Sequence, residues 1–154
     1  MNTKINIIFL DIDGVLARYP GLLNKYKEDK RDNFGPGFND SCVEFLEEIV
    51  HQTNSKIVIS SSWKRLGLER LKTIFRVRGV DVDIIDTIPL YGLPRGEEIQ
   101  LWLDENDKYD IDKYIILDDR IGDLWESHGD RFIKTESQLG ITEEIKDIGI
   151  KLLS

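Results

Sequence analysis

Short apolar runs alternate along the chain with segments in which apolar residues recur at helical spacing. The runs at 4–10, 56–59 and 114–117 are nearly continuous, which is typical of strands buried on both faces of a parallel sheet. Runs at 82–85 and 131–135 indicate two further strands. The pattern therefore predicts about five strands, separated by helical or polar segments.

Helical spacing is clearest in the segment that begins at Ser41, where Glu44 three residues later completes a capping-box pattern. A basic helical segment comes next and ends at Gly79. Two further helices are expected over 96–105 and from Thr142 onward. The residues expected to face the core on the first three helices are Cys42, Phe45, Leu46, Ile49, Val50, Leu68, Leu71, Ile74, Phe75, Ile99, Trp102 and Leu103.

Strands that alternate with helices imply right-handed βαβ units, and hence an α/β fold of three layers around a central parallel sheet. The segment 15–39 interrupts this alternation, because it is rich in Lys and Asp and closes with a Phe-Gly-Pro-Gly stretch at 34–37. We expect it to form a long loop or flap. It is too short for a large cap domain, so we treat 1–154 as one domain with an insertion at 15–39.

The overall charge narrows the choice of partners. The 154 residues carry a net charge of −8, which opposes nonspecific attraction to nucleic acid or to anionic membranes. The single cysteine, Cys42, cannot form an intrachain disulfide, and neither a signal peptide nor a membrane-length apolar run is expected. We expect a soluble, cytoplasmic protein with no membrane partner and no obligate protein partner.

Acidic pairs stand where two of the predicted strands stop. The 4–10 run is followed by Asp11 and Asp13, and the 114–117 run by Asp118 and Asp119. Active residues of parallel α/β sheets lie beyond the carboxyl ends of the strands, so the two pairs would meet there. Carboxylates brought together in this way need a cation, and hard oxygen ligands suit Mg²⁺. We therefore expect these four residues to form a Mg²⁺ site.

The order of these features resembles the haloacid dehalogenase (HAD) superfamily of aspartate-nucleophile phosphatases. FLDIDGV is similar to its first motif, IVISSSW to its second and IILDD to its fourth. Arg95 takes the place of the third, basic motif, where the superfamily usually has Lys. More narrowly, LDIDGVL, ISSSWK, PRGEEIQLWL and YIILDD together resemble the small domain of this superfamily associated with RNA-repair proteins. The resemblance implies a Rossmann-like fold without a large cap domain.

The resemblance also implies a role for each motif. Asp11 would attack phosphorus and form an aspartyl-phosphate, and Asp13 would protonate the leaving oxygen and then take a proton from water. A hydroxyl of Ser60 or Ser61 would bind a phosphoryl oxygen, and either serine fits. Arg95 would bind the substrate phosphate, because it precedes a predicted helix whose N-terminus also faces negative charge.

Metal binding is shared in the same way. Asp118 and Asp119 would complete the Mg²⁺ shell with Asp11 and the backbone carbonyl of Asp13, and either member of the 118–119 pair could contact the ion directly. Asp123 fits either a place in this site or a loop cap. Other conspicuous residues are expected to be structural, with the tryptophans in the core instead of forming a base-stacking platform: His51, His128, Trp63, Trp102, Trp125 and Cys42.

An uncapped site can admit the end of a large substrate. The segment 63–78 has six basic residues against Glu69 alone, which could steer a polyanion but equally fits a solvated helix face. Arg18 and Lys25 in the flap are further candidates for substrate phosphate. We expect a Mg²⁺-dependent phosphatase whose substrate is a nucleotide or a nucleic-acid terminal phosphate. The six basic residues are Lys64, Arg65, Arg70, Lys72, Arg76 and Arg78.

Other functions remain open at this point. The same residues suit a phosphotransferase or phosphomutase, a phosphatase of small metabolites, or an inactive HAD-like binding or regulatory module. A phospho-acceptor receiver domain also has strand-end aspartates, but it expects its acceptor at the end of the middle strand, where this chain has Ser60.

Overall fold

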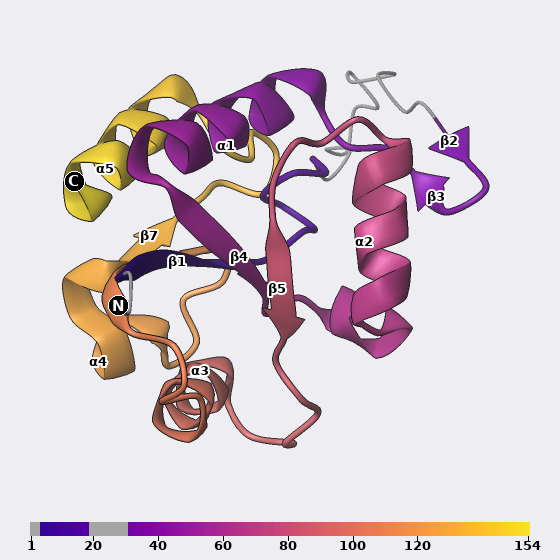
Figure 1. Cartoon of the computed structure of the whole chain (residues 1–154). Helices are drawn as coiled ribbons and strands as arrows, with labels where there is room; N and C mark the ends of the chain where they lie inside the picture. The colour runs from indigo at the N-terminus through magenta and orange to yellow at the C-terminus, as the bar shows by residue number, and fades with distance from the viewer. Residues whose placement is uncertain (1–3, 19–30) are drawn as a thin grey trace.

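A five-stranded sheet forms the centre of the molecule in the computed structural model, which describes residues 4–18 and 31–154 (Figure 1). All neighbouring strands of this sheet pair in parallel, in the order β5-β4-β1-β6-β7. The chain runs outward from β1 to β5 and then returns to the other side of β1, so the topological switch point lies between β1 and β6. The strands are β1 Ile5–Leu10, β4 Ser55–Ile59, β5 Ile84–Thr87, β6 Ile111–Asp118 and β7 Phe132–Lys134.

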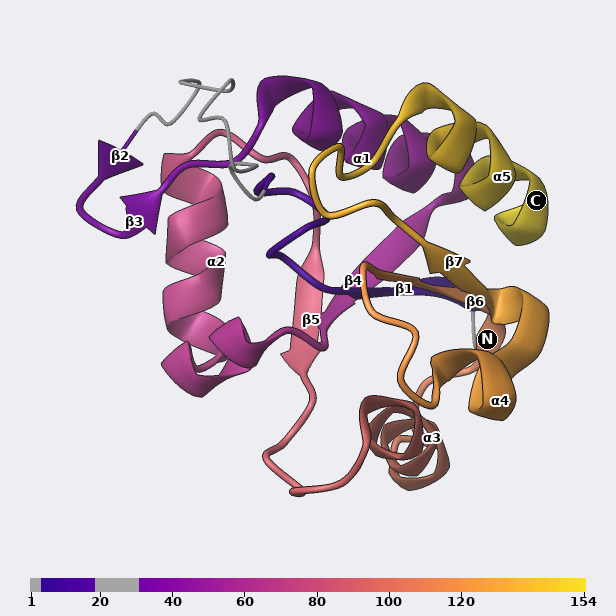
Figure 2. The same cartoon turned by 180° about the vertical axis from the view of Figure 1, so that it is seen from behind.

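Helices cover both faces of the sheet, which gives the three layers that the sequence predicts (Figures 1 and 2). One face packs against α1 Asp40–Thr53, α2 Leu68–Val77 and α5 Glu143–Leu153. The other face packs against α3 Arg95–Glu105 and the short α4 Leu124–His128. Helix α4 and two 3-10 helices, η1 Ser62–Leu66 and η2 Gly129–Arg131, lie where the sequence pattern gave no separate prediction.

Alternation along the central strand β1 explains its continuous apolar run. Ile8 and Leu10 lie in the core under α1, whereas Ile7 and Phe9 lie in the core under α3, and all four are fully buried. The ring of Phe9 meets Trp102 of α3 edge-on at 5.5 Å between centroids. Over the stretch 7–10, where β1 is buried on both faces, successive positions are apolar, as predicted.

Some boundaries differ from the sequence prediction by two or more residues, among them the start of β6, which begins at Ile111 instead of at 114. Helix α1 begins at Asp40, and its cap is Asn39, whose side chain accepts a hydrogen bond from the Cys42 amide at 3.0 Å. The predicted capping box of Ser41 and Glu44 is therefore wrong. The cap lies two residues earlier in the chain than Ser41, where the Asn39 side chain accepts the hydrogen bond of an amide that would otherwise be free. Strand β5 begins two residues later than the predicted 82–85 run, because pairing with β4 starts at Ile84.

The 15–39 insertion is described in part. Its last portion forms a small antiparallel hairpin of β2 Arg31–Asp32 and β3 Gly35–Pro36, next to α2 in Figures 1 and 2. Lys25, a predicted phosphate contact, lies outside the described residues. Among the ranges 4–18 and 31–154, no helix is both long and apolar enough to cross a bilayer.

The predictions for individual core residues are confirmed at some positions and wrong at one. Cys42 and Trp102 are fully buried, as expected. Trp125 is wrong as a core residue, since 58% of it is exposed on α4. The physical reason is the brevity of α4, which buries Leu124 and His128 against the sheet and turns Trp125 between them to solvent.

Candidate active site

Asp11 and Asp118, the first members of the two acidic pairs, lie close together because β1 and β6 are adjacent parallel strands whose ends are aligned. Leu10 of β1 lies opposite Leu117 of β6, and the amide of Asp11 donates to the carbonyl of Leu117 at 3.0 Å. Asp11 is therefore level with Asp118, the last residue of β6. Both carboxylates are buried at the carboxyl ends of their strands, beside the switch point.

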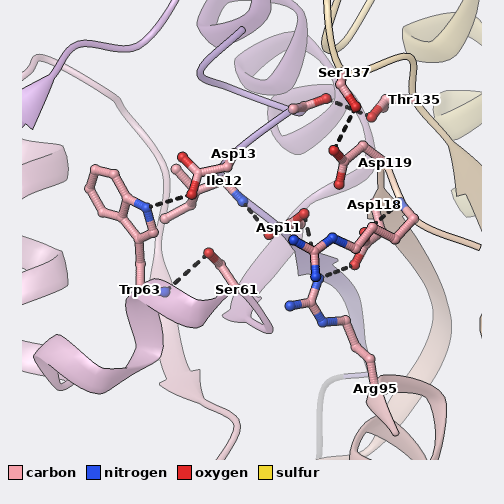
Figure 3. Close-up of polar contacts among 12 residues, drawn as sticks. Asp11, Ile12, Asp13, Ser61, Trp63, Arg95, Asp118, Asp119, Thr135 and Ser137 are labelled. Atoms are coloured by element: carbon pink, nitrogen blue, oxygen red, sulfur yellow. Dashed lines mark hydrogen bonds and ion pairs between the residues drawn. The ribbon is translucent and has the colours of Figure 1, made fainter. Parts of the chain in front are cut away.

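Three carboxylates converge at this point. Asp11, Asp118 and Asp119 each offer an oxygen atom, and these oxygens lie within 4.8 Å of one another. The guanidinium of Arg95 enters from the first turn of α3, with Nη1 2.6 Å from Asp118 Oδ2 and 3.5 Å from Asp11 Oδ2 (Figure 3). One Arg faces three carboxylates, so negative charge remains in excess.

That excess, together with burial, governs the protonation of the site. Burial and then the charge of Asp118 raise the pKa of Asp11 to about 8, against the lowering influence of Arg95. Burial likewise raises the pKa of Asp118. Burial on its own would lower the pKa of Arg95, but the charges of Asp118 and Asp11 outweigh it and raise that pKa. The cluster therefore favours the arrival of a further positive charge.

The donor set fits a hard divalent cation. The three converging side chains supply only carboxylate oxygens, and Mg²⁺ is commonly held by one or two carboxylates with the rest of its shell taken from water and substrate phosphate. Asp13 does not belong to this carboxylate cluster. Its predicted contribution to the ion is its backbone carbonyl.

Gly14 gives Asp119 the room to reach the cluster. Gly14 has φ of +81°, and a Cβ at that position would stand 2.3 Å from Oδ2 of Asp119. The same Oδ2 accepts a hydrogen bond from the hydroxyl of Ser137 at 2.7 Å, and Thr135 donates to the carbonyl of Gly14 at 2.7 Å. Sequence reasoning missed Thr135 and Ser137, although two hydroxyl-bearing residues at and just beyond the end of the predicted fifth strand were a usable signal.

The two serines that follow β4 differ in their hydrogen bonds. The hydroxyl of Ser61 accepts from the amide of Trp63 at 3.2 Å and so caps the 3-10 helix η1. The hydroxyl of Ser60 is buried, and it has no hydrogen-bond partner within 4–18 and 31–154. A buried donor without a partner is uncommon and points to an absent ligand or water.

Asp13 is held from the other side of the site. Its Oδ2 accepts a hydrogen bond from the indole nitrogen of Trp63 at 3.2 Å, as Figure 3 shows. Trp63 is partly buried against the core, so the expectation of a packing role is correct but incomplete. The geometry brings this tryptophan into direct contact with a predicted catalytic residue.

Asp123 stands apart from the acidic cluster. Its two oxygens accept hydrogen bonds from the amides of Gly96 and Glu97 at 2.7 and 3.1 Å, so it caps the N-terminus of α3. Of the two roles left open for this residue, the structure shows the cap. His128 is structural as expected, because its ring bonds the Tyr114 hydroxyl and the Gly96 carbonyl.

Three of the six basic residues in 63–78 form ion pairs, and one of them is the exposed Lys72, whose Nζ lies 4.0 Å from Glu69 Oε1 on the same helix. Lys64 forms a buried ion pair with Glu98 at 2.9 Å, and Arg78 is paired with Asp32 at 2.9 Å. Four basic residues of the segment remain exposed: Arg65, Arg70, Lys72 and Arg76. The predicted basic patch is thus smaller than the sequence suggests.

The fold and this arrangement of acidic residues define a small HAD-like α/β domain. A family model described as "HAD domain in Swiss Army Knife RNA repair proteins" matches residues 7–145, and the chain belongs to that family. Both the superfamily and the narrower resemblance inferred from the motifs are confirmed. The comparison with curated proteins finds no match.

Proposed function

We propose that this protein is a Mg²⁺-dependent phosphatase that hydrolyses a phosphomonoester through an aspartyl-phosphate on Asp11. The observation that carries the proposal is the convergence of Asp11, Asp118 and Asp119 with Arg95 at the switch point of a HAD-like sheet. Such a cluster has little use as packing, because burial of several like charges is costly unless a cation offsets them.

Asp11 is fixed for attack by the backbone amide of the next residue. Its Oδ1 accepts a hydrogen bond from the amide of Ile12 at 2.9 Å, and Oδ2 faces Arg95. In the first step an Asp11 oxygen bonds to phosphorus while the bond to the leaving oxygen breaks, and Asp13 donates the proton that this oxygen needs. In the second step Asp13 takes a proton from water as the water oxygen bonds to phosphorus, and the bond to Asp11 breaks to release phosphate.

Three other groups complete the proposed site. Ser60 is favoured over Ser61 as the phosphoryl ligand, because its buried hydroxyl is unpartnered in the described part of the chain while that of Ser61 caps η1. Arg95 would contact a phosphoryl oxygen from its place between the two buried aspartates. Bound Mg²⁺, held by the 11, 118 and 119 carboxylates and the carbonyl of Asp13, would neutralise charge on the transferring phosphoryl group.

The proposed substrate is the terminal phosphate of a nucleotide or nucleic acid. Two observations support it: the family description refers to RNA repair, and four exposed basic residues lie on η1 and α2, which follow directly from Ser61. A polyanionic substrate would be attracted by such local positive charge in spite of the net charge of −8.

One observation favours the alternative of a non-catalytic binding module. Arg95 already makes a short ion pair with Asp118, so an internal cation neutralises part of the negative charge that a metal would otherwise neutralise. Mg²⁺ binding separates the two functions. A catalytic site binds Mg²⁺ measurably by calorimetry, and a retired site in which Arg95 is the only counter-charge does not.

The activity test is a phosphate-release screen with Mg²⁺ or with EDTA. Its substrates are nucleotides, oligonucleotides phosphorylated at either end, sugar phosphates and phosphopeptides. Mg²⁺-dependent release from oligonucleotides, weakened when Arg70 and Arg76 are replaced together by Gln, supports the proposed substrate. Phosphate release from sugar phosphates alone would overturn the proposed substrate. No phosphate release from any of the four classes of substrate would overturn the proposal that the protein is an enzyme.

A further inference from the structure

We propose that Trp63 is a positioning residue, which orients the carboxyl group of Asp13 toward the leaving oxygen through its indole N–H. This inference rests on the proposed phosphatase function. The contact that carries it is the hydrogen bond from Trp63 Nε1 to Asp13 Oδ2 at 3.2 Å (Figure 3).

The chemistry of indole gives this contact a direction. An indole nitrogen can donate a hydrogen bond but cannot accept one, so it always presents its N–H to Asp13. The Oδ2 atom of Asp13 is thereby occupied on that side, and Oδ1 is the oxygen left to hold the proton that is given to the leaving group. Without the indole, the carboxyl could rotate about its terminal torsion, which has broad minima.

The indole itself is held rigidly. The amide of Trp63 donates to the hydroxyl of Ser61, which fixes the first turn of η1. The Trp63 ring packs against Phe38 at 5.9 Å between centroids, and the guanidinium of Arg78 lies 4.5 Å from the Phe38 ring and 5.8 Å from the Trp63 ring. Arg78 is in turn fixed by two hydrogen bonds of 2.9 Å to Asp32.

This arrangement places a preformed support behind Asp13. The support draws on the end of α2, the β2–β3 hairpin and the segment before α1, and contacts of Arg78 link all three. A positioned acid of this kind lowers the barrier only when the leaving oxygen needs a proton. An alkoxide needs one, whereas para-nitrophenolate leaves without one.

The test compares two substrates in Trp63→Phe, which keeps the ring packing and removes the N–H. We expect phosphate release from a terminally phosphorylated oligonucleotide to fall about 10- to 100-fold, the range for losing a hydrogen bond to a charged group. The first-turnover burst of para-nitrophenolate from para-nitrophenyl phosphate should change by less than about threefold, because that step precedes the action of Asp13 on water and its leaving group needs no acid. Trp125→Phe, an exposed aromatic on α4, is the matched control and should change neither rate.

A double-mutant cycle asks whether Trp63 acts through Asp13. If it does, Trp63→Phe adds little further loss in the Asp13→Asn background. A loss in the para-nitrophenolate burst equal to the loss on the oligonucleotide in the single variant, or additive losses in the cycle, would show a structural role and overturn the proposal.

A second readout does not depend on activity. The indole ¹H–¹⁵N resonance that disappears in Trp63→Phe identifies this N–H, and it should shift in Asp13→Ala while the Trp125 indole resonance does not. An unshifted resonance overturns the contact. If the resonance shifts and the wild-type protein releases phosphate from no substrate, the proposed phosphatase function fails while the Trp63–Asp13 contact stands.

Discussion

Mg²⁺ should stabilise this protein against unfolding, and the stabilisation should grow with pH. In the metal-free protein the pKa of Asp11 is about 8, against an ordinary value of 3.8. A carboxyl group whose folded pKa is raised favours the folded state fully below its unfolded pKa, and this contribution is lost as pH rises through the folded pKa. The metal-free fold therefore loses stability from this group between about pH 4 and pH 8.

The size of the effect follows from the same shift. One pKa unit corresponds to about 1.36 kcal/mol, so raising the pH from about 6 to about 8.5 removes roughly 2–3 kcal/mol of stability through Asp11. For a domain of this size, that corresponds to a fall in unfolding temperature of roughly 4–12 °C. Mg²⁺ binds the ionised carboxylates and should restore most of this loss at the higher pH.

The assay is thermal unfolding followed by circular dichroism, at both pH values, with Mg²⁺ or with EDTA at matched ionic strength. In Asp11→Asn, both the pH-dependent loss and most of the Mg²⁺ effect should disappear, because amide nitrogen and oxygen do not ionise. A Mg²⁺ effect that is absent, or that is equal at the two pH values and unchanged in Asp11→Asn, would refute the reasoning.

Two further predictions concern the supports of the site. Gly14→Ala should lower the free energy of unfolding by about 1–3 kcal/mol because of its positive φ, and it should also weaken Mg²⁺ binding by displacing Asp119. The control is Gly79→Ala, which has φ of +73° and no atom within 4 Å of the added Cβ. It should show a similar loss of stability but no change in the Mg²⁺ affinity measured by calorimetry. Lys64→Met should cost about 3–5 kcal/mol in urea unfolding because it leaves Glu98 buried without its partner, and a cost below about 1 kcal/mol would contradict that account.

The sheet was predictable because its central strands are buried on both faces. The fully buried stretches 7–10 of β1, 57–59 of β4 and 115–117 of β6 are apolar at every position, so they stand out as continuous runs. The acidic residues that follow β1 and end β6 mark the edge where the site lies. Asp11 and Asp118 could be brought together on paper, because parallel strands in one sheet align their carboxyl ends.

Contacts between distant segments were beyond the sequence pattern. The bond from Trp63 to Asp13 joins positions fifty apart in the chain, and an indole that packs and donates at once looks the same as one that only packs. Lys64 and Arg78 belong to a basic segment in the sequence, but each forms an ion pair with an acidic residue of another element. Neither therefore adds to the positive charge of the surface. The exposure of Trp125 depends on how α4 meets the sheet, and five residues carry too little periodicity to show which side faces inward.

The central claim is that Asp11 is the nucleophile of a Mg²⁺-dependent phosphatase. The most direct measurement is phosphate release by the wild-type protein and by Asp11→Asn, with Mg²⁺ and a substrate found active in the screen, after unfolding curves show that both are folded. We predict Mg²⁺-dependent turnover in the wild type and none above background in Asp11→Asn. Substantial turnover by a folded Asp11→Asn protein would contradict the claim.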